Sequence, residues 1–170
     1  MAETKRLEIP IEVLQDVFFE AMLAGWVSGA TPVNLPELPG ARQFCFKEEN
    51  KYGNIFVLDT YWTFRGSSVS FGFTNIYHNN DAVWHMRYGG EYHKDAIKTV
   101  KQALKEAYER QKFFGGRGMI SFAHRQKWYH NNPVRGSDFT SFSGRESVEL
   151  VGIDISLGYH EYSGGLLLAP

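Results

Sequence analysis

The sequence contains very little cysteine, since Cys45 is the only one among 170 residues. A single thiol excludes an intrachain disulfide and any metal site built from several cysteines. A chain without disulfides suits a reducing compartment, so we expect a cytoplasmic location.

The sequence also lacks an excess of charge and a long apolar run. Its 18 basic residues nearly balance its 19 acidic ones, which gives a net charge of −1. This balance gives no electrostatic reason to expect nucleic acid or an anionic membrane as a partner. The apolar part of residues 11–27 is interrupted by charged residues, and no window approaches the roughly 20 apolar residues of a membrane-spanning helix. We therefore expect neither a nucleic acid nor a membrane partner.

Aromatic residues, by contrast, are abundant, with 13 Phe, 9 Tyr and 4 Trp. Aromatic side chains suit sheets and pockets, and each buries about 150–250 Å². A chain of this length buries roughly 70% of the surface that it exposes when unfolded. We therefore expect one domain spanning residues 1–170 that is stable without a disulfide bond.

The spacing of apolar residues predicts two helices and a series of strands. One apolar stripe at steps of three and four indicates a helix near the N-terminus, at Ile11, Leu14, Phe18, Met22 and Trp26. A second stripe predicts a helix from Lys94 to Lys112, capped by Gly115 and Gly116. Shorter patterns predict strands at 44–46, 54–64, 69–77, 82–88, 119–122, 124–130, 138–151 and 153–162. Short turns indicate antiparallel pairing, so the sequence predicts an α+β fold with two helices packed on an antiparallel β-sheet.

Two segments of the chain are similar in sequence to later segments, which indicates an internal duplication. Residues 66–72 resemble residues 136–144, and residues 84–90 resemble residues 159–165, where each segment ends in a double glycine. A repeat of this length indicates that one structural unit occurs twice in the chain. We predict a duplicated α-ββββ unit, with halves at about 10–90 and 91–168.

The duplication sets two histidines, His85 and His160, at matched positions before the double glycines. Strand alternation places each histidine opposite the more apolar side of its strand. An aromatic and histidine-lined groove can bind a small molecule. Our leading hypothesis is therefore a small-molecule-binding or sensor-like module, with ligand-binding residues Trp84, His85, Arg87, Tyr159, His160 and Asp59.

Two other functions stay open. Asp59 lies on an apolar strand, where a carboxylate is costly unless it is paired, so Asp59 and a histidine could act as acid and base in a hydrolase or isomerase. Alternatively, an edge strand or an aromatic patch could pair with another protein, including a second copy in a homodimer.

Metal, cofactor and nucleophile motifs are weak or missing. No histidine spacing is typical of a zinc site, and the glycines at 115–118 follow a helix, whereas phosphate loops precede one. We therefore expect no metal and no cofactor. There is no G-x-S-x-G elbow, and nothing in the sequence pairs a serine with a histidine, so nucleophilic catalysis has little support.

The aromatic and glycine pattern resembles an uncharacterised bacterial domain family whose members occur alone or behind helix-turn-helix regulators. The resemblance covers roughly residues 11–168 and is carried by Asp59, Tyr61, Phe71, Gly72, Val83, Trp84, Met86, Tyr88, Gly89, Phe142, Gly144, Glu146, Tyr159, Gly164 and Gly165. The chain departs from the pattern at Gly72-Phe73-Thr74, where an acidic residue is expected after the glycine, and it has no helix-turn-helix segment of its own. Because that family has no assigned activity, the resemblance implies the fold and not a reaction.

Overall fold

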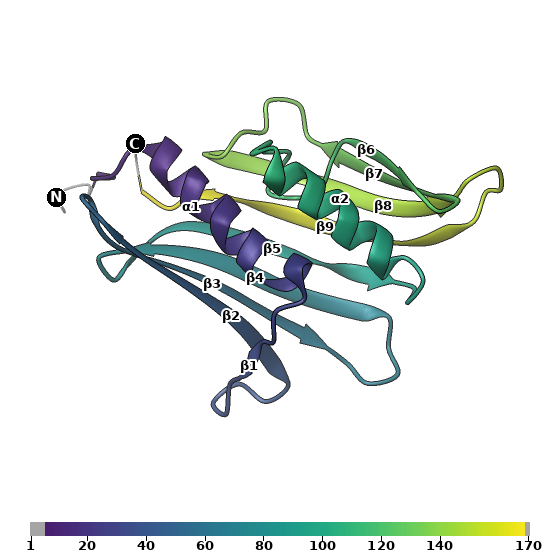
Figure 1. Cartoon of the computed structure of the whole chain (residues 1–170), viewed down its shortest axis with the longest axis horizontal. Coiled ribbons are helices and arrows are strands. Elements are labelled where there is room, and N and C mark those ends of the chain that lie inside the picture. The colour runs from purple at the N-terminus through teal and green to yellow at the C-terminus, as the bar shows by residue number, and fades with distance from the viewer. Residues whose placement is uncertain (1–5, 169–170) are drawn as a thin grey trace, which may run out of the picture.

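The computed structural model describes residues 6–168 and places two α-helices, a short 3₁₀ helix and nine strands in them. The elements follow one another along the chain as labelled in Figure 1. They are α1 (Ile11–Ala24), η1 (Trp26–Ser28), β1 (Val33–Asn34), β2 (Ala41–Asn50), β3 (Gly53–Thr63), β4 (Val69–His78), β5 (Asp81–Tyr92), α2 (Ile97–Glu109), β6 (Ser121–His124), β7 (Lys127–Pro133), β8 (Ser141–Leu150) and β9 (Ser156–Leu166).

In the described part of the chain, the nine strands form one sheet in the order β1-β2-β3-β4-β5-β9-β8-β7-β6. Every pair of neighbouring strands is antiparallel. Two meanders, β2–β5 and β6–β9, therefore meet where β5 pairs with β9. The predicted α+β class, with two helices and an antiparallel sheet, is confirmed.

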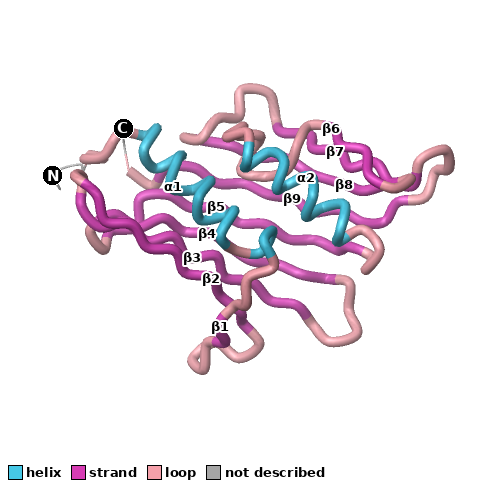
Figure 2. Tube along the Cα trace, in the orientation of Figure 1, coloured by secondary structure: helices cyan, strands magenta, loops and turns pink. Residues whose placement is uncertain are grey.

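Both helices lie over the same face of the sheet, side by side (Figures 1 and 2). The Phe18 ring of α1 lies 5.2 Å from the Trp84 ring of β5 and 6.0 Å from the Tyr108 ring of α2. The Trp84 ring stacks on Phe139, and its indole nitrogen donates to the Phe139 carbonyl at 2.8 Å. Because Trp84 is fully buried, its predicted place in a ligand groove is wrong, and it belongs to the core under the helices.

Several element boundaries differ from prediction, and two of the differences involve glycines. α2 ends at Glu109, so Gly115 and Gly116 are not its cap. Gly115 instead lies against the Tyr162 ring, where a Cβ would come within 2.3 Å of a ring carbon. β9 begins at Ser156, because residues 151–155 form a turn around Gly152, whose φ is +83°.

The two histidines lie on opposite faces of the sheet. Tyr88 of β5 is paired with Tyr162 of β9, and His160 is paired with Gly90. Residues paired in this way point to the same face, so His160 faces the helices together with Tyr88, and His85 faces away. The prediction that both histidines line one groove is therefore wrong: His85 lies three positions before Tyr88, whereas His160 lies two positions before Tyr162, which pairs with Tyr88. A change of one residue moves a strand side chain to the other face.

Candidate functional site

A cavity of about 130 Å³ lies between the helices and the sheet. Its roof is mainly apolar and comes from α1, η1 and α2, through Met22, Trp26, Val27, Val100 and Leu104. Its floor comes from the sheet and carries the polar side chains, among them Asp59, Ser70, Tyr88, Tyr92 and His160. Arg117, from the loop after α2, completes the lining. Thr63, at the end of β3, also lines the cavity and is exposed.

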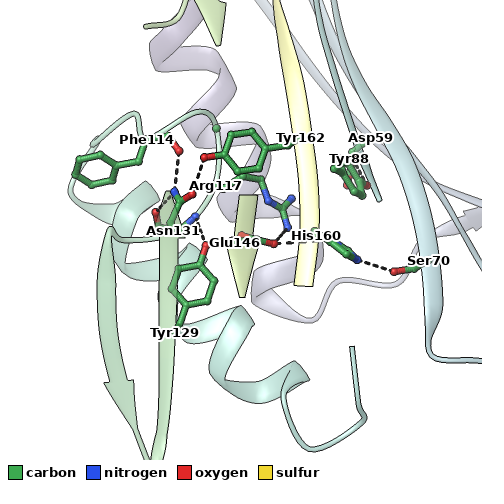
Figure 3. A network of polar contacts seen from close by, with 12 residues as sticks. Asp59, Ser70, Tyr88, Phe114, Arg117, Tyr129, Asn131, Glu146, His160 and Tyr162 are labelled. Atoms are coloured by element: carbon green, nitrogen blue, oxygen red, sulfur yellow. Dashed lines mark hydrogen bonds and ion pairs between the residues drawn. The ribbon is translucent and has the colours of Figure 1, made fainter. Parts of the chain in front are cut away.

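A row of residues crosses four neighbouring strands of the floor. In order, the paired residues are Ser70 of β4, Gly90 of β5, His160 of β9 and Glu146 of β8. Ser70 Oγ and His160 Nε2 lie 3.0 Å apart, although the two residues are separated by 90 positions in the sequence. His160 Nδ1 lies 3.8 Å from Glu146 Oε1 (Figure 3).

Gly90 makes the contact between Ser70 and His160 sterically feasible. Its φ is +154°, and a Cβ there would come 2.2 Å from the Tyr159 carbonyl oxygen and 3.1 Å from His160 Cα and Cδ2. The missing side chain leaves room for the imidazole to pass over β5. Gly90, which belongs to the first of the two double glycines noted in the sequence, therefore leaves the space in which His160 reaches Ser70.

Glu146 and Arg117 form a buried ion pair beside His160. Arg117 Nη2 donates to Glu146 Oε1 at 2.6 Å, and the side chains are 8% and 0% exposed. Tyr129 donates its hydroxyl hydrogen to the other carboxylate oxygen of Glu146. The loop that carries Arg117 is held by Asn131, whose amide donates to the carbonyls of Phe114 and Gly118 at 2.9 Å (Figure 3). The guanidinium is therefore fixed in place.

Burial and these neighbours set the charge state of the row. Burial, and then the positive charge of Arg117, lowers the pKa of His160 to about 4 in spite of Glu146. Burial opposes the ionised form of Glu146, but Arg117, His160 and Tyr129 hold the pKa of its carboxyl below its usual value. At neutral pH the row thus consists of a neutral imidazole between a serine hydroxyl and an ionised carboxylate.

Asp59 forms a second polar cluster on the same floor. Its Oδ1 accepts hydrogen bonds from Tyr88 Oη at 2.8 Å and from Thr74 Oγ1 at 2.9 Å. Burial raises the pKa of Asp59 against the effect of these two hydrogen bonds and of Arg117. The Arg117 guanidinium lies 5.0 Å from the centre of the Tyr88 ring, which links the two clusters.

Within residues 6–168, three buried side-chain polar atoms have no hydrogen-bond partner: Tyr92 Oη, Arg117 Nε and His160 Nδ1. All three belong to residues that line the cavity. A buried polar atom left unpaired costs about 1–3 kcal/mol, and native proteins leave few of them. Their concentration around one cavity distinguishes it from the rest of the core.

The structure brings together only some of the predicted site residues. Asp59 and His160 line the cavity, whereas His85, Arg87 and Tyr159 lie on the other face of the sheet. There, His85 Nδ1 contacts Asn75 Oδ1 at 2.6 Å, and Arg87 Nε donates to Ser163 Oγ at 2.7 Å. The predicted groove is therefore divided between two faces.

Sequence reasoning missed Ser70, Tyr92, Arg117 and Glu146. The expectation that no serine pairs with a histidine is wrong, because Ser70 contacts His160 through the register of β4, β5 and β9. Strand alternation could have placed Ser70 opposite its exposed neighbours Val69 and Phe71, but it could not have shown which residue lies two strands away. In the described ranges, no group of three or more histidine, cysteine or acidic residues could hold a metal ion. Neither α1 nor α2, in the same ranges, has the length and apolar character needed to cross a membrane.

Comparison with known protein families gives a match over more than half of the chain. Residues 61–167 match the family model described as "Domain of unknown function (DUF5680)". The matched range includes Ser70, Tyr92, Arg117, Glu146 and His160, and it excludes α1 and Asp59. No curated protein and no solved structure gives a significant match.

Proposed function

Because the chain belongs to the DUF5680 family, whose function is unknown, its activity must be inferred from the site, and we propose that the cavity binds a small molecule. The proposed ligand has a compact apolar body and one uncharged hydrogen-bond acceptor, such as a carbonyl oxygen. The observation that carries this proposal is the set of three unpartnered polar atoms around one mainly apolar cavity.

The size of the cavity supports a ligand of about one ring. An apolar cavity of about 150 Å³ holds one benzene molecule, and this cavity measures about 130 Å³. Because the lining residue Thr63 is exposed, a longer ligand would extend past it to the surface.

The charge of the site supports an uncharged acceptor. Arg117 Nε carries a hydrogen that meets no acceptor, while the charge of the guanidinium is already paired with Glu146. A carboxylate ligand would add a second negative charge to this buried pair, and unbalanced buried charge is costly. A carbonyl oxygen would accept the hydrogen without that cost.

The experiment compares cyclohexanone with methylcyclohexane, which matches it in size and lacks the oxygen. We expect saturable binding of cyclohexanone by protein NMR and weaker binding of methylcyclohexane. Tyr92→Phe, which deletes an unpartnered hydroxyl, should leave the ligand-free protein as stable as before or more stable, yet weaken cyclohexanone binding by about tenfold. His85→Ala, on the other face, is the matched control and should bind normally. Failure of both ligands to bind would overturn the proposal.

A second candidate is acid–base catalysis, because Asp59 and His160 line the same cavity. A carboxyl with a raised pKa is a stronger base once ionised, and such groups are concentrated at functional sites. In this function Asp59 would remove a proton beside the ligand carbonyl. Exchange of the cyclohexanone α-protons with D₂O, followed by NMR, would be accelerated by the wild type and not by Asp59→Asn; equal rates would exclude this role.

We also propose that residues 1–170 form one domain built from two α-ββββ halves, about 10–90 and 91–168. Matching hydrogen bonds support the duplication: Tyr88 donates to Asp59, and Tyr162 donates to Asn131 at 2.5 Å. Each tyrosine is also paired with a glycine on the preceding strand of its meander, Gly72 or Gly144. Three other expectations stay predictions: a cytoplasmic location, no nucleic acid or membrane partner, and a protein-interaction role as a homodimer. Light scattering would test the homodimer.

A further inference from the structure

We propose that Ser70, His160 and Glu146 form an acyl-transfer centre that hydrolyses small carboxylic esters bound in the cavity. Ser70 is the nucleophile, His160 the general base and Glu146 the residue that orients the imidazole. This inference rests on the proposed binding function, since the ester must occupy the same cavity.

The geometry matches what nucleophilic catalysis requires. A serine nucleophile needs a base within about 2.6–3.2 Å, and the base needs a third group that orients it. Ser70 Oγ and His160 Nε2 lie 3.0 Å apart, and Glu146 Oε1 lies on the Nδ1 side of the ring at 3.8 Å. Catalytic hydrogen bonds are often long in ligand-free proteins and tighten with substrate.

The position of the carboxylate selects the useful tautomer of His160. A carboxylate near Nδ1 favours the hydrogen on that nitrogen, which leaves Nε2 free to accept the Ser70 hydroxyl hydrogen. Glu146 is fully buried, and the Arg117 ion pair and the Tyr129 hydrogen bond fix its orientation. Glu146 is therefore a positioning residue for the imidazole.

The same wall offers a donor for the oxygen that becomes negative during attack. Arg117 Nε carries a hydrogen without an acceptor, and Arg117 lines the cavity together with Ser70. Donors held in place before reaction stabilise a developing oxyanion without reorganisation.

The reaction proceeds in two balanced steps. Ser70 Oγ attacks the ester carbonyl carbon while its proton moves to His160 Nε2. The carbon–oxygen bond to the alcohol then breaks, and the alcohol leaves with that proton. Water attacks the acyl-serine, gives a proton to His160 Nε2, and the carboxylic acid leaves as Ser70 regains its hydrogen. The sum is ester plus water giving acid plus alcohol.

The test uses phenyl acetate hydrolysis and labelling by methanesulfonyl fluoride, a small reagent that sulfonylates activated serines. We expect wild-type turnover and a single adduct mapped to Ser70 by mass spectrometry. Ser70→Ala should lower kcat/KM by about 1000-fold or more while keeping cyclohexanone affinity within about twofold. Ser163→Ala, which changes a half-buried serine on the other face, is the matched control and should behave as wild type.

The outcomes separate this inference from the binding proposal. If cyclohexanone binds but Ser70 is not labelled and Ser70→Ala hydrolyses phenyl acetate as fast as wild type, the acyl-transfer centre is refuted and the binding site stands. If nothing binds and nothing reacts, both proposals fail. His160→Asn and Glu146→Gln should each lower phenyl acetate turnover, because they remove the general base and the carboxylate that orients it. If Glu146→Gln fails to fold, His160→Asn still tests the mechanism, and unchanged turnover in it would refute the mechanism.

Discussion

The buried, neutral imidazole of His160 predicts that the protein loses stability as the pH falls from about 6.5 to about 4. A histidine in the unfolded chain has a pKa of about 6.5, whereas burial and Arg117 lower the pKa of His160 to about 4. Between these values the unfolded chain binds more protons than the folded protein. The free energy of unfolding therefore falls as the pH falls through that window, and this contribution is complete above about pH 6.5.

The size of the effect follows from the two pKa values. The interval between 6.5 and about 4, at about 1.36 kcal/mol per pH unit, corresponds to about 3 kcal/mol. The groups that face His160 contribute separately: Glu146 and Arg117 carry charge, and Ser70 and Tyr92 are neutral at these pH values. Glu146 adds to the loss only at lower pH, because the pKa of its carboxyl lies below the usual value.

The assay is urea unfolding of wild type and His160→Gln at pH 7 and pH 4.5. We expect the wild type to lose about 2–3 kcal/mol more than the variant between these pH values. His93→Gln, whose side chain is exposed, is the matched control and should follow the wild type. An equal loss in wild type and His160→Gln would refute the argument, because acid destabilisation would then arise elsewhere.

Three further substitutions test the packing around the site. Arg117→Met should destabilise by about 3–5 kcal/mol, because it leaves the buried charge of Glu146 without its cation, and chemical unfolding would measure the loss. Gly90→Ala should destabilise by at least about 2 kcal/mol and abolish Ser70 labelling, because the new methyl group would collide with the Tyr159 carbonyl and with His160. Trp84→Ala should cost about 3–5 kcal/mol and show in the melting temperature, since Trp84 is fully buried. A loss below about 1 kcal/mol in any of them would contradict the packing described.

Local patterns in the sequence were sufficient to predict most elements. The stripe that begins at Ile11 became α1, and the alternating segments became strands close to their predicted places. The end of the chain was misjudged because Ile153 and Ile155 alternate with polar residues like strand residues, although both lie exposed in a turn. Alternation alone does not distinguish a strand from an apolar turn of this kind.

The site was harder to predict because its residues meet through register. Strand alternation correctly separated His85 from Trp84 and His160 from Tyr159. The side of β9 that carries His160 was predicted to be the less apolar one, yet it also carries Tyr162, which is buried. The choice depended on which face the helices cover, and no single strand contains that information. Asp59 was found because a carboxylate on an apolar strand is conspicuous, whereas a serine on a strand is not.

The junction of β5 with β9 has a consequence for the order of folding. Ser70 belongs to one meander, while His160 and Glu146 belong to the other, and they meet only across Gly90. Each meander forms from contacts close in sequence, but the contact between Ser70 and His160 closes a separation of 90 residues, and distant contacts of this kind form slowly. Modification of Ser70 would therefore report the completion of folding, and a chain cut between β5 and α2 would regain the site only at concentrations at which its two fragments associate.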